Sequence, residues 1–205
     1  MTQHILSVER LMQFHDALIS SDGQHTDITL PLSQDHALGK AVEDNHRFNC
    51  LLWAEEDLAR RLNVPDSAIA ANKRAIDGFN QQRNDATERV DEGLLNHLAK
   101  VVRAPSALQN SETPGAMVDR LSILALKTYH MRLQTLRRDV DDQHRRRCSE
   151  KLELLLEQRH DLGVALDRVL EECLLGTTFF KIYRQFKMYN DPSLNPQLYR
   201  PVGPA

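Results

Sequence analysis

The sequence has few of the features that mark disulfide-rich or membrane proteins. Only three of its 205 residues are cysteines, and Cys50, Cys148 and Cys173 lie far apart without any C-x-x-C pair. Neither a disulfide framework nor a zinc knuckle is therefore predicted, and a reducing, cytoplasmic location is expected. No run approaches the roughly 20 apolar residues that span a bilayer. The N-terminal stretch MTQHILSVERLMQFHDALISS also lacks the unbroken apolar segment of a signal peptide.

An excess of charge of one sign is missing too. The chain has 26 Lys and Arg against 29 Asp and Glu, a net charge of −3. The molecule as a whole therefore offers no field that attracts nucleic acid or an anionic membrane, although a local basic patch is still possible, and we predict no nucleic-acid partner. Aromatic residues make up only 5% of the chain, and they gather with cations in FFKIYRQFKMYNDPSLNP, residues 179–196. A nucleic-acid-binding protein could use such a segment for base stacking, but we interpret it as a terminal helix that docks its aromatic residues on the rest of the fold.

The common catalytic motifs are also absent. The sequence contains no glycine-rich phosphate loop, no G-x-S-x-G and no H-E-x-x-H, so the enzyme classes that carry them are not indicated. Two E-x-x-H segments, at 43–46 and 157–160, have the spacing of ligands in di-iron helical bundles. Helical projection turns Glu157 and His46 away from the apolar sides of their helices, so we predict no metal site. The sequence indicates no particular cofactor.

Helical periodicity dominates what is present, and strand-like alternation is limited to residues 27–32. Thr113-Pro114 has the pattern of an N-cap followed by proline at the first helical position, and Gly176 can end a helix. We predict an all-α fold, a mostly antiparallel bundle of five to six helices. An N-terminal helix and irregular connection should occupy 1–40, the helical bundle 41–190 and a proline-rich extended tail 191–205. The predicted helices lie near 3–20, 41–62, 67–99, 114–144, 149–175 and 177–188.

Three charged residues project into the apolar sides of predicted helices: Glu55, Arg83 and Arg159. An unpaired buried charge costs several kcal/mol, so each of them needs a partner or solvent. In one interpretation the three converge, and two arginines around one glutamate leave positive charge for an anionic ligand such as phosphate or carboxylate. In the other, which describes a commoner arrangement, Glu55 and Arg83 form a structural ion pair and Arg159 reaches the surface.

The predicted helix 114–144 carries Asp119, Arg120, Lys127 and His130 within an arc of roughly 100°, opposite its apolar face. The simplest interpretation is a solvated face. The alternative is a face that lines a cleft, because an acid, cations and an imidazole are the groups that acid/base catalysis or the recognition of a polar ligand requires.

Four stretches occur in order along the chain: HRFNCLLWAEEDLARR (46–61), NKRAIDGFNQQRNDATERVDE (72–92), SETPGAMVDRLSILALKTYHM (111–131) and YRQFKMYNDPSLNP (183–196). Together they resemble the bacterial family known as domain of unknown function 4254. Its members are often encoded beside glycosyltransferases of surface-polysaccharide assembly. The resemblance therefore implies a role near nucleotide-sugar or lipopolysaccharide chemistry, with a glycosyltransferase or another glycan-assembly protein as partner. The family-like polar residues are His46, Asn49, Trp53, Glu56, Asp57, Asn80, Arg83, Asp85, Glu112, Asp119, Arg120, Lys127, His130, Lys187, Tyr189 and Asn190.

From these residues and the resemblance we expect a binding or accessory protein that recognises a phosphorylated sugar or nucleotide-sugar in a polar cleft. Arg83, Arg120 and Lys127 would hold the anion. The hydroxyl groups would be held by His46, Glu56, Asp57 and Asp119, with Asn49, Trp53 and Asn80 as further ligand contacts.

Two other functions remain open from the sequence. One is an enzyme that uses the same cleft, with His130 or Glu56 as general base and Asp119 orienting it. The other is a structural partner that binds no ligand and forms a homodimer through its helical faces.

Overall fold

The computed structural model describes residues 6–20, 36–185, 188 and 191–199. Its long elements are the helices α1 (Val8–Ser20), α2 (His36–Leu58), α3 (Asp66–His97), α4 (Pro114–Thr135) and α5 (Asp142–Leu174). The strands β1 (Leu108–Gln109) and β2 (Thr178–Phe179) and the one-turn helix α6 (Pro196–Tyr199) are short. The predicted all-α class is therefore confirmed. The strand-like residues 27–32 and the family-like residues Lys187, Tyr189 and Asn190 lie outside the described part.

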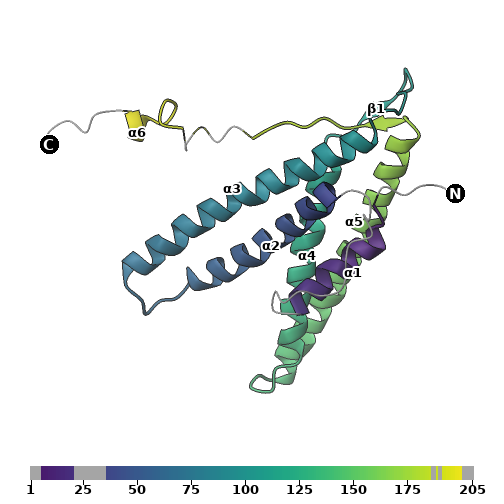
Figure 1. Cartoon of the computed structure of the whole chain (residues 1–205). Helices are drawn as coiled ribbons and strands as arrows, with labels where there is room; N and C mark the ends of the chain where they lie inside the picture. The colour runs from purple at the N-terminus through teal and green to yellow at the C-terminus, as the bar shows by residue number, and fades with distance from the viewer. Residues whose placement is uncertain (1–5, 21–35, 186–187, 189–190, 200–205) are drawn as a thin grey trace.

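Two helical hairpins form the body of the molecule. Helices α2 and α3 lie side by side, as do α4 and α5, and the two pairs cross (Figure 1). Helix α4 contacts both α2 and α3, and α1 packs on α4 and α5. All five long helices contribute to one apolar core, which includes Leu11, Leu38, Leu94, Leu121 and Leu166. No helix in the described ranges is long and apolar enough to cross a membrane.

The beginning of α4 follows the sequence prediction. Thr113 Oγ1 accepts a hydrogen bond from the Ala116 backbone N–H at 3.2 Å, and Pro114 occupies the first helical position. The predicted end at residue 144 is wrong, because α4 ends at Thr135 and α5 begins at Asp142. Asp141 caps α5 by accepting a hydrogen bond from the His144 N–H at 2.6 Å. The predicted start of the fifth helix at residue 149 is therefore seven residues too late.

The predicted helix at 177–188 is not found in its described part. Gly176 ends α5 with a φ of 71°, as predicted, but the chain then forms β2, which pairs in parallel with β1. Residues 180–185 continue without helix along α3. Arg184 forms an ion pair with Glu92 at 2.9 Å, and the Asn84 amide donates to Gln185 Oε1 at 2.8 Å. A short run of apolar and aromatic residues cannot distinguish helix from strand by periodicity, which explains the error.

Candidate functional site

A pocket of about 280 Å³ opens between α3, the start of α4 and the segment after β2. We call it the Asp119 pocket. Its acidic lining residues are Glu88, Asp91, Glu112 and Asp119, and Arg83 is the one cation among the described residues that line it. The other lining residues are Asn84, Thr87, Ser111, Thr113, Ala116, Ile182, Tyr183 and Gln185.

Asp119 forms the floor of this pocket. Its Oδ1 accepts hydrogen bonds from the Asn45 amide at 2.8 Å and from the Asn49 amide at 2.9 Å. Its Oδ2 lies 3.9 Å from Arg83 Nη1. The side chain remains 15% exposed. The carboxylate is therefore held in one orientation, and its second oxygen is available to a hydrogen-bond donor on a ligand.

Arg83 stands beside Asp119 with an N–H donor that the described residues do not use. Its side chain is 25% exposed, and Nη2 donates to Asn84 Oδ1 at 2.9 Å. Its Nε is buried and has no hydrogen-bond partner in the described part of the chain. A guanidinium can bind a carboxylate or phosphate through two parallel N–H groups. Because the side chain is partly exposed while Nε is buried, the Nη groups of Arg83 can bind one anionic group of a ligand.

A buried polar layer supports the floor from behind and consists of His15, His46, Asn49 and Ser122. The Asn49 amide donates to Ser122 Oγ at 3.0 Å, and His46 Nδ1 lies 2.7 Å from the same oxygen. The rings of His46 and His15 stack with their centroids 4.5 Å apart. Because all four residues are buried, they position Asp119 but cannot themselves reach a ligand in the pocket.

The two histidines of this layer are neutral at pH 7. Burial lowers the pKa of His15 well below its ordinary value and that of His46 to about 4, and the nearby Arg159 charge acts in the same direction. The short His46–Ser122 distance is that of a general base and a nucleophile. Ser122 is fully buried, however, so this pair is structural.

Asp91 closes the pocket at the start of α4. Its Oδ1 accepts a hydrogen bond from the Gly115 N–H at 2.6 Å, so a side chain of α3 caps α4. Burial raises the pKa of Asp91 to about 6, although hydrogen bonds from Thr113 and Gly115 oppose the rise. A Cβ atom on Gly115 would lie 2.6 Å from the Thr87 backbone oxygen and 2.7 Å from Asp91 Cγ. The close approach of α3 and α4 therefore requires glycine at this position.

The model of one protein family, described as a protein of unknown function (DUF4254), matches residues 39–182. The chain belongs to this family. The match confirms the resemblance seen in the sequence, but the last of the four stretches, residues 183–196, follows its end. Neither the curated proteins nor the solved structures contain a significant match.

The structure divides the family-like residues among several places. Asp119, Arg83 and Glu112 line the Asp119 pocket, and Arg120 is exposed and pairs with Glu112 Oε1 at 2.6 Å. Lys127 is exposed on α4, eight residues after Asp119 and thus about 12 Å further along the helix axis.

Helical projection placed His46 on the side of α2 opposite its apolar stripe, but this part of α2 does not face solvent. It packs against α4, so His46 and Asn49 lie in the buried polar layer and do not line the pocket. Asn80 is half-buried on α3 and is not a lining residue either.

Trp53, Asp57 and His130 form a separate group further along α2 and α4. The Trp53 and His130 rings stack with centroids 4.4 Å apart and an angle of 6° between their planes. Burial lowers the pKa of His130, and the nearby Asp57 carboxylate partly opposes this effect. Glu56 forms an exposed ion pair with Arg60 at 2.6 Å. The two proposed general bases, His130 and Glu56, therefore lie outside the Asp119 pocket.

The three charges in the apolar stripes do not converge. Glu55 accepts a hydrogen bond from the Asn72 amide at 2.6 Å, and Arg83 follows Asn72 by about 16 Å on α3. Arg159 is buried; it pairs with Asp16 at 2.9 Å and donates to the Met12 carbonyl at 2.9 Å. Both interpretations of these residues, a shared anion site and a Glu55–Arg83 ion pair, are therefore wrong.

Sequence reasoning missed Asn45, Thr87, Asp91 and Ser122. The Asn45 amide also donates to Thr87 Oγ1 at 3.0 Å. A signal for Asn45 was present, because it precedes Asn49 by four residues and the two amides share one face of α2. Within the described ranges, no group of three or more His, Cys, Asp or Glu side chains is arranged to hold a metal ion.

Proposed function

We propose that the chain is a binding or accessory protein of bacterial surface-glycan assembly, and that the Asp119 pocket holds the sugar ring of a phosphorylated sugar or nucleotide-sugar. The observation that carries the proposal is the Asp119 carboxylate, fixed by two asparagine amides and placed beside Arg83. An oriented carboxylate accepts hydrogen bonds from hydroxyl groups, and an amide N–H donates hydrogen bonds to them. The glycan context rests on the family resemblance.

The charge of the pocket favours a ligand rich in hydroxyl groups over one rich in phosphate. Four carboxylates face one arginine, so several phosphate charges would meet repulsion. Of the three cations predicted to hold an anion, only Arg83 lines the pocket; Arg120 is paired with Glu112 and Lys127 lies outside. The ligand should therefore place its one inserted anionic group against Arg83.

The size of the pocket limits how much of the ligand it can enclose. Its volume of about 280 Å³ is near the lower end of the roughly 300–1,000 Å³ that is usual for small-molecule sites. We therefore assign it a single sugar ring, with any nucleotide extending outward past Tyr183. The Tyr183 side chain is 67% exposed and presents a ring on which a sugar or base can stack.

Thermal unfolding and titration calorimetry with free monosaccharides, sugar 1-phosphates, nucleotide-sugars and nucleoside diphosphates test this proposal. A ligand at 100 times its dissociation constant should add about 2.7 kcal/mol to the free energy of unfolding. Arg83→Gln should remove the added stability of phosphorylated ligands. Lys127→Gln is the matched control and should retain it. Equal losses in both variants, or no stabilisation by any sugar-containing ligand, would refute the proposal.

Asp91 supports a second candidate, an enzyme that acts on the same ligand. It lines the pocket, and a pKa of about 6 suits proton transfer near neutral pH. Chromatography of sugar phosphates incubated with the protein would reveal turnover. An enzyme requires turnover that Asp91→Asn abolishes without loss of ligand-induced stabilisation. If a ligand binds but is not turned over, the enzyme is excluded and the binding protein remains the proposed function.

That the protein forms a homodimer and that it binds a glycan-assembly protein both remain predictions. Light scattering of the purified protein tests the dimer.

A further inference from the structure

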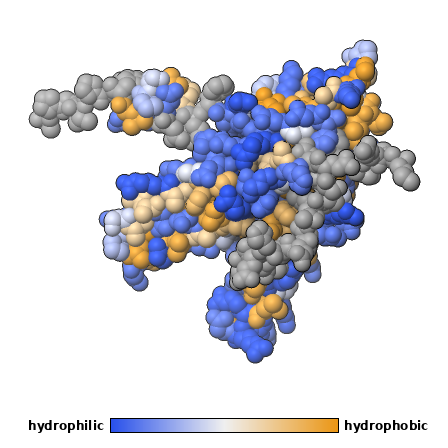
Figure 2. All heavy atoms as spheres, in the orientation of Figure 1, coloured by the Kyte–Doolittle hydropathy of each residue, from blue (hydrophilic) through white to orange (hydrophobic). Residues whose placement is uncertain are grey.

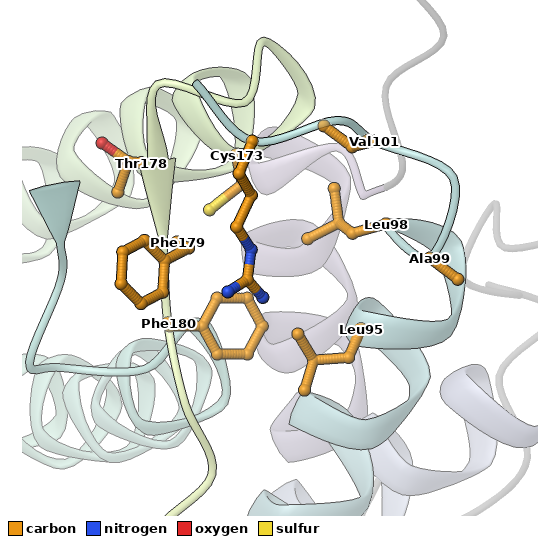
Figure 3. A pocket seen from close by; sticks show the side chains of 9 residues that line it. Leu95, Leu98, Ala99, Val101, Cys173, Thr178, Phe179 and Phe180 are labelled. Atoms are coloured by element: carbon orange, nitrogen blue, oxygen red, sulfur yellow. The ribbon is translucent and has the colours of Figure 1, made fainter. Parts of the chain in front are cut away.

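A second and larger pocket, of about 490 Å³, lies at the end of the molecule where α3 and α5 finish. We call it the Arg103 pocket. Leucines from the end of α3 and Phe179 and Phe180 from the chain at β2 surround the hollow (Figure 3). It shares no lining residue with the Asp119 pocket. Its lining residues are Leu95, Leu98, Ala99, Val101, Arg103, Cys173, Thr178, Phe179 and Phe180.

The connection that carries Arg103 is fixed to the end of α5. A Cβ atom on Gly176 would lie 2.3 Å from the Val102 backbone oxygen, so only glycine permits this approach. The Gly176 carbonyl accepts a hydrogen bond from the Ala104 N–H at 2.9 Å. The Leu108 N–H likewise donates to the Thr177 carbonyl at 2.9 Å. These contacts form the pocket without a ligand.

The wall of the pocket is apolar. Seven of its nine lining residues have apolar or thiol side chains. Apolar surface continues beyond the pocket at the same end of the molecule, where Val102, Leu108 and Leu175 are exposed and hydrophobic atoms gather near β1 (Figure 2). A ligand of this pocket must therefore have an apolar body.

Arg103 gives the apolar wall one cation. The Thr178 hydroxyl already donates to Glu172 Oε2 at 2.8 Å, whereas Arg103 forms no ion pair with any residue that the structure describes. Its guanidinium carbon lies 4.6 Å from the centre of the Phe179 ring. Lys181 approaches the same ring at 5.9 Å but does not line the pocket. A guanidinium stacked on an aromatic ring keeps its N–H edge free for an anion.

The thiol in the wall does not provide covalent chemistry. Burial raises the pKa of Cys173 to about 11, and the nearby Glu172 charge adds to the rise. The thiolate is the reactive form of cysteine, so at neutral pH this side chain is an apolar wall group. Ligands are therefore held without a covalent bond.

We propose that the Arg103 pocket binds a small amphipathic anion. Its single carboxylate or phosphate head contacts the Arg103 guanidinium, and its unbranched aliphatic tail lies among Leu95, Leu98, Phe179 and Phe180. The proposal is independent of the sugar ligand, because the two pockets have separate linings.

Titration calorimetry of the full chain with decanoate and decyl phosphate, below their micellar concentrations, tests this assignment. Both anions should bind, and the tighter one identifies the head group. Decyltrimethylammonium, which has the opposite charge, should bind at least about tenfold more weakly, since a hydrogen bond to a charged group contributes roughly this factor or more. Acetate keeps the head group but lacks the tail, so it should also bind at least about tenfold more weakly because it buries almost no apolar surface.

Three variants locate the binding. Arg103→Gln should weaken binding of both anions at least about tenfold. Ala99→Trp should block it, and the exposure of Ala99 makes this change compatible with folding. Arg138→Gln is the control and should leave binding unchanged, because Arg138 is an exposed arginine in the connection between α4 and α5, before the start of α5. Unchanged affinity in Arg103→Gln or Ala99→Trp, equal binding of decyltrimethylammonium, or no binding of either anion would overturn the proposal.

Discussion

Acidification should destabilise the protein through the stacked histidines of the buried polar layer. In the unfolded chain the His46 imidazole takes up a proton below its ordinary pKa of 6.5, whereas in the folded chain burial delays protonation to about pH 4. Between these values the unfolded state binds more protons than the folded state, so the free energy of unfolding falls as the pH falls. The stabilising contribution is complete above pH 6.5 and is lost by about pH 4.

The magnitude follows from the pKa difference. One pKa unit corresponds to about 1.4 kcal/mol, so a change from 6.5 to about 4 in His46 is worth about 3 kcal/mol. His15 acts in the same direction, because burial lowers its pKa as well. Asp91 acts in the opposite direction: its folded pKa of about 6 exceeds its ordinary 3.8, so acidification across this interval favours the folded state.

Urea unfolding of the wild type and of His46→Gln at pH 7, 6, 5 and 4 measures the contribution of His46 together with its effect on the stacked His15. Glutamine keeps a polar side chain beside Ser122 but does not titrate. Asp91 contributes equally to both proteins, so it cancels in their difference. The stability advantage of the wild type over the variant should shrink by about 3 kcal/mol between pH 7 and pH 4.

The matched control is His160→Gln, which removes one exposed histidine of α5. The difference in the free energy of unfolding between His160→Gln and the wild type shows how much pH dependence arises from losing an exposed imidazole. If the gap between wild type and His46→Gln stays constant from pH 7 to pH 4, His46 is not held neutral by burial, and the reasoning fails.

Three further predictions concern the packing of the helices. Gly115→Ala should lower the free energy of unfolding in urea by about 1–3 kcal/mol, because its Cβ would lie 2.6 Å from a backbone oxygen of α3. The control Gly78→Ala should raise it by about 0.5–1 kcal/mol, because a Cβ there meets nothing within 4 Å. Equal effects of the two substitutions would contradict this. The emission of Trp53, the single tryptophan, should be quenched when the stacked His130 is protonated, and only below pH 6.5, because burial lowers the pKa of His130. His130→Phe should abolish this step. A midpoint above 6.5 would contradict the lowered pKa, and a pH-dependent step that persists in His130→Phe would contradict its assignment to His130. Deletion of residues 1–20 should abolish cooperative unfolding or strongly lower its midpoint, because Leu6 and three apolar side chains of α1, Val8, Leu11 and Phe14, are buried in the core. An unchanged midpoint would show that α1 does not dock.

Periodicity predicted the helical class because it reports burial within one helix. Thr113-Pro114 marked the start of α4 by local capping chemistry, which sequence shows directly. The break after Thr135 carries neither glycine nor proline, so nothing interrupted the apolar pattern there. Its clearest signal is Asp141, whose capping role depends on a chain reversal that periodicity does not report.

The site was harder to predict than the fold because its contacts join distant parts of the chain. Asp119 and Arg83 were identified as polar residues on helical faces, and the structure brings them together. Their support was not visible, since the Asn45–Asp119 hydrogen bond spans 74 positions. Helical projection assumes one buried face, but α2 is covered by both α3 and α4. His46 therefore seemed outward-facing although it is fully buried.

The position of α1 separates the region that relatives share from the unit that folds. The family match begins at residue 39, yet Leu11 and Phe14 belong to the same core as the matched helices. The buried guanidinium of Arg159, inside the match, finds its hydrogen-bond acceptors on Met12 and Asp16, outside it. A fragment cut to the family boundaries would retain the floor of the Asp119 pocket but leave a buried cation and an open apolar surface. A fragment chosen for expression or for comparison with relatives should therefore include α1.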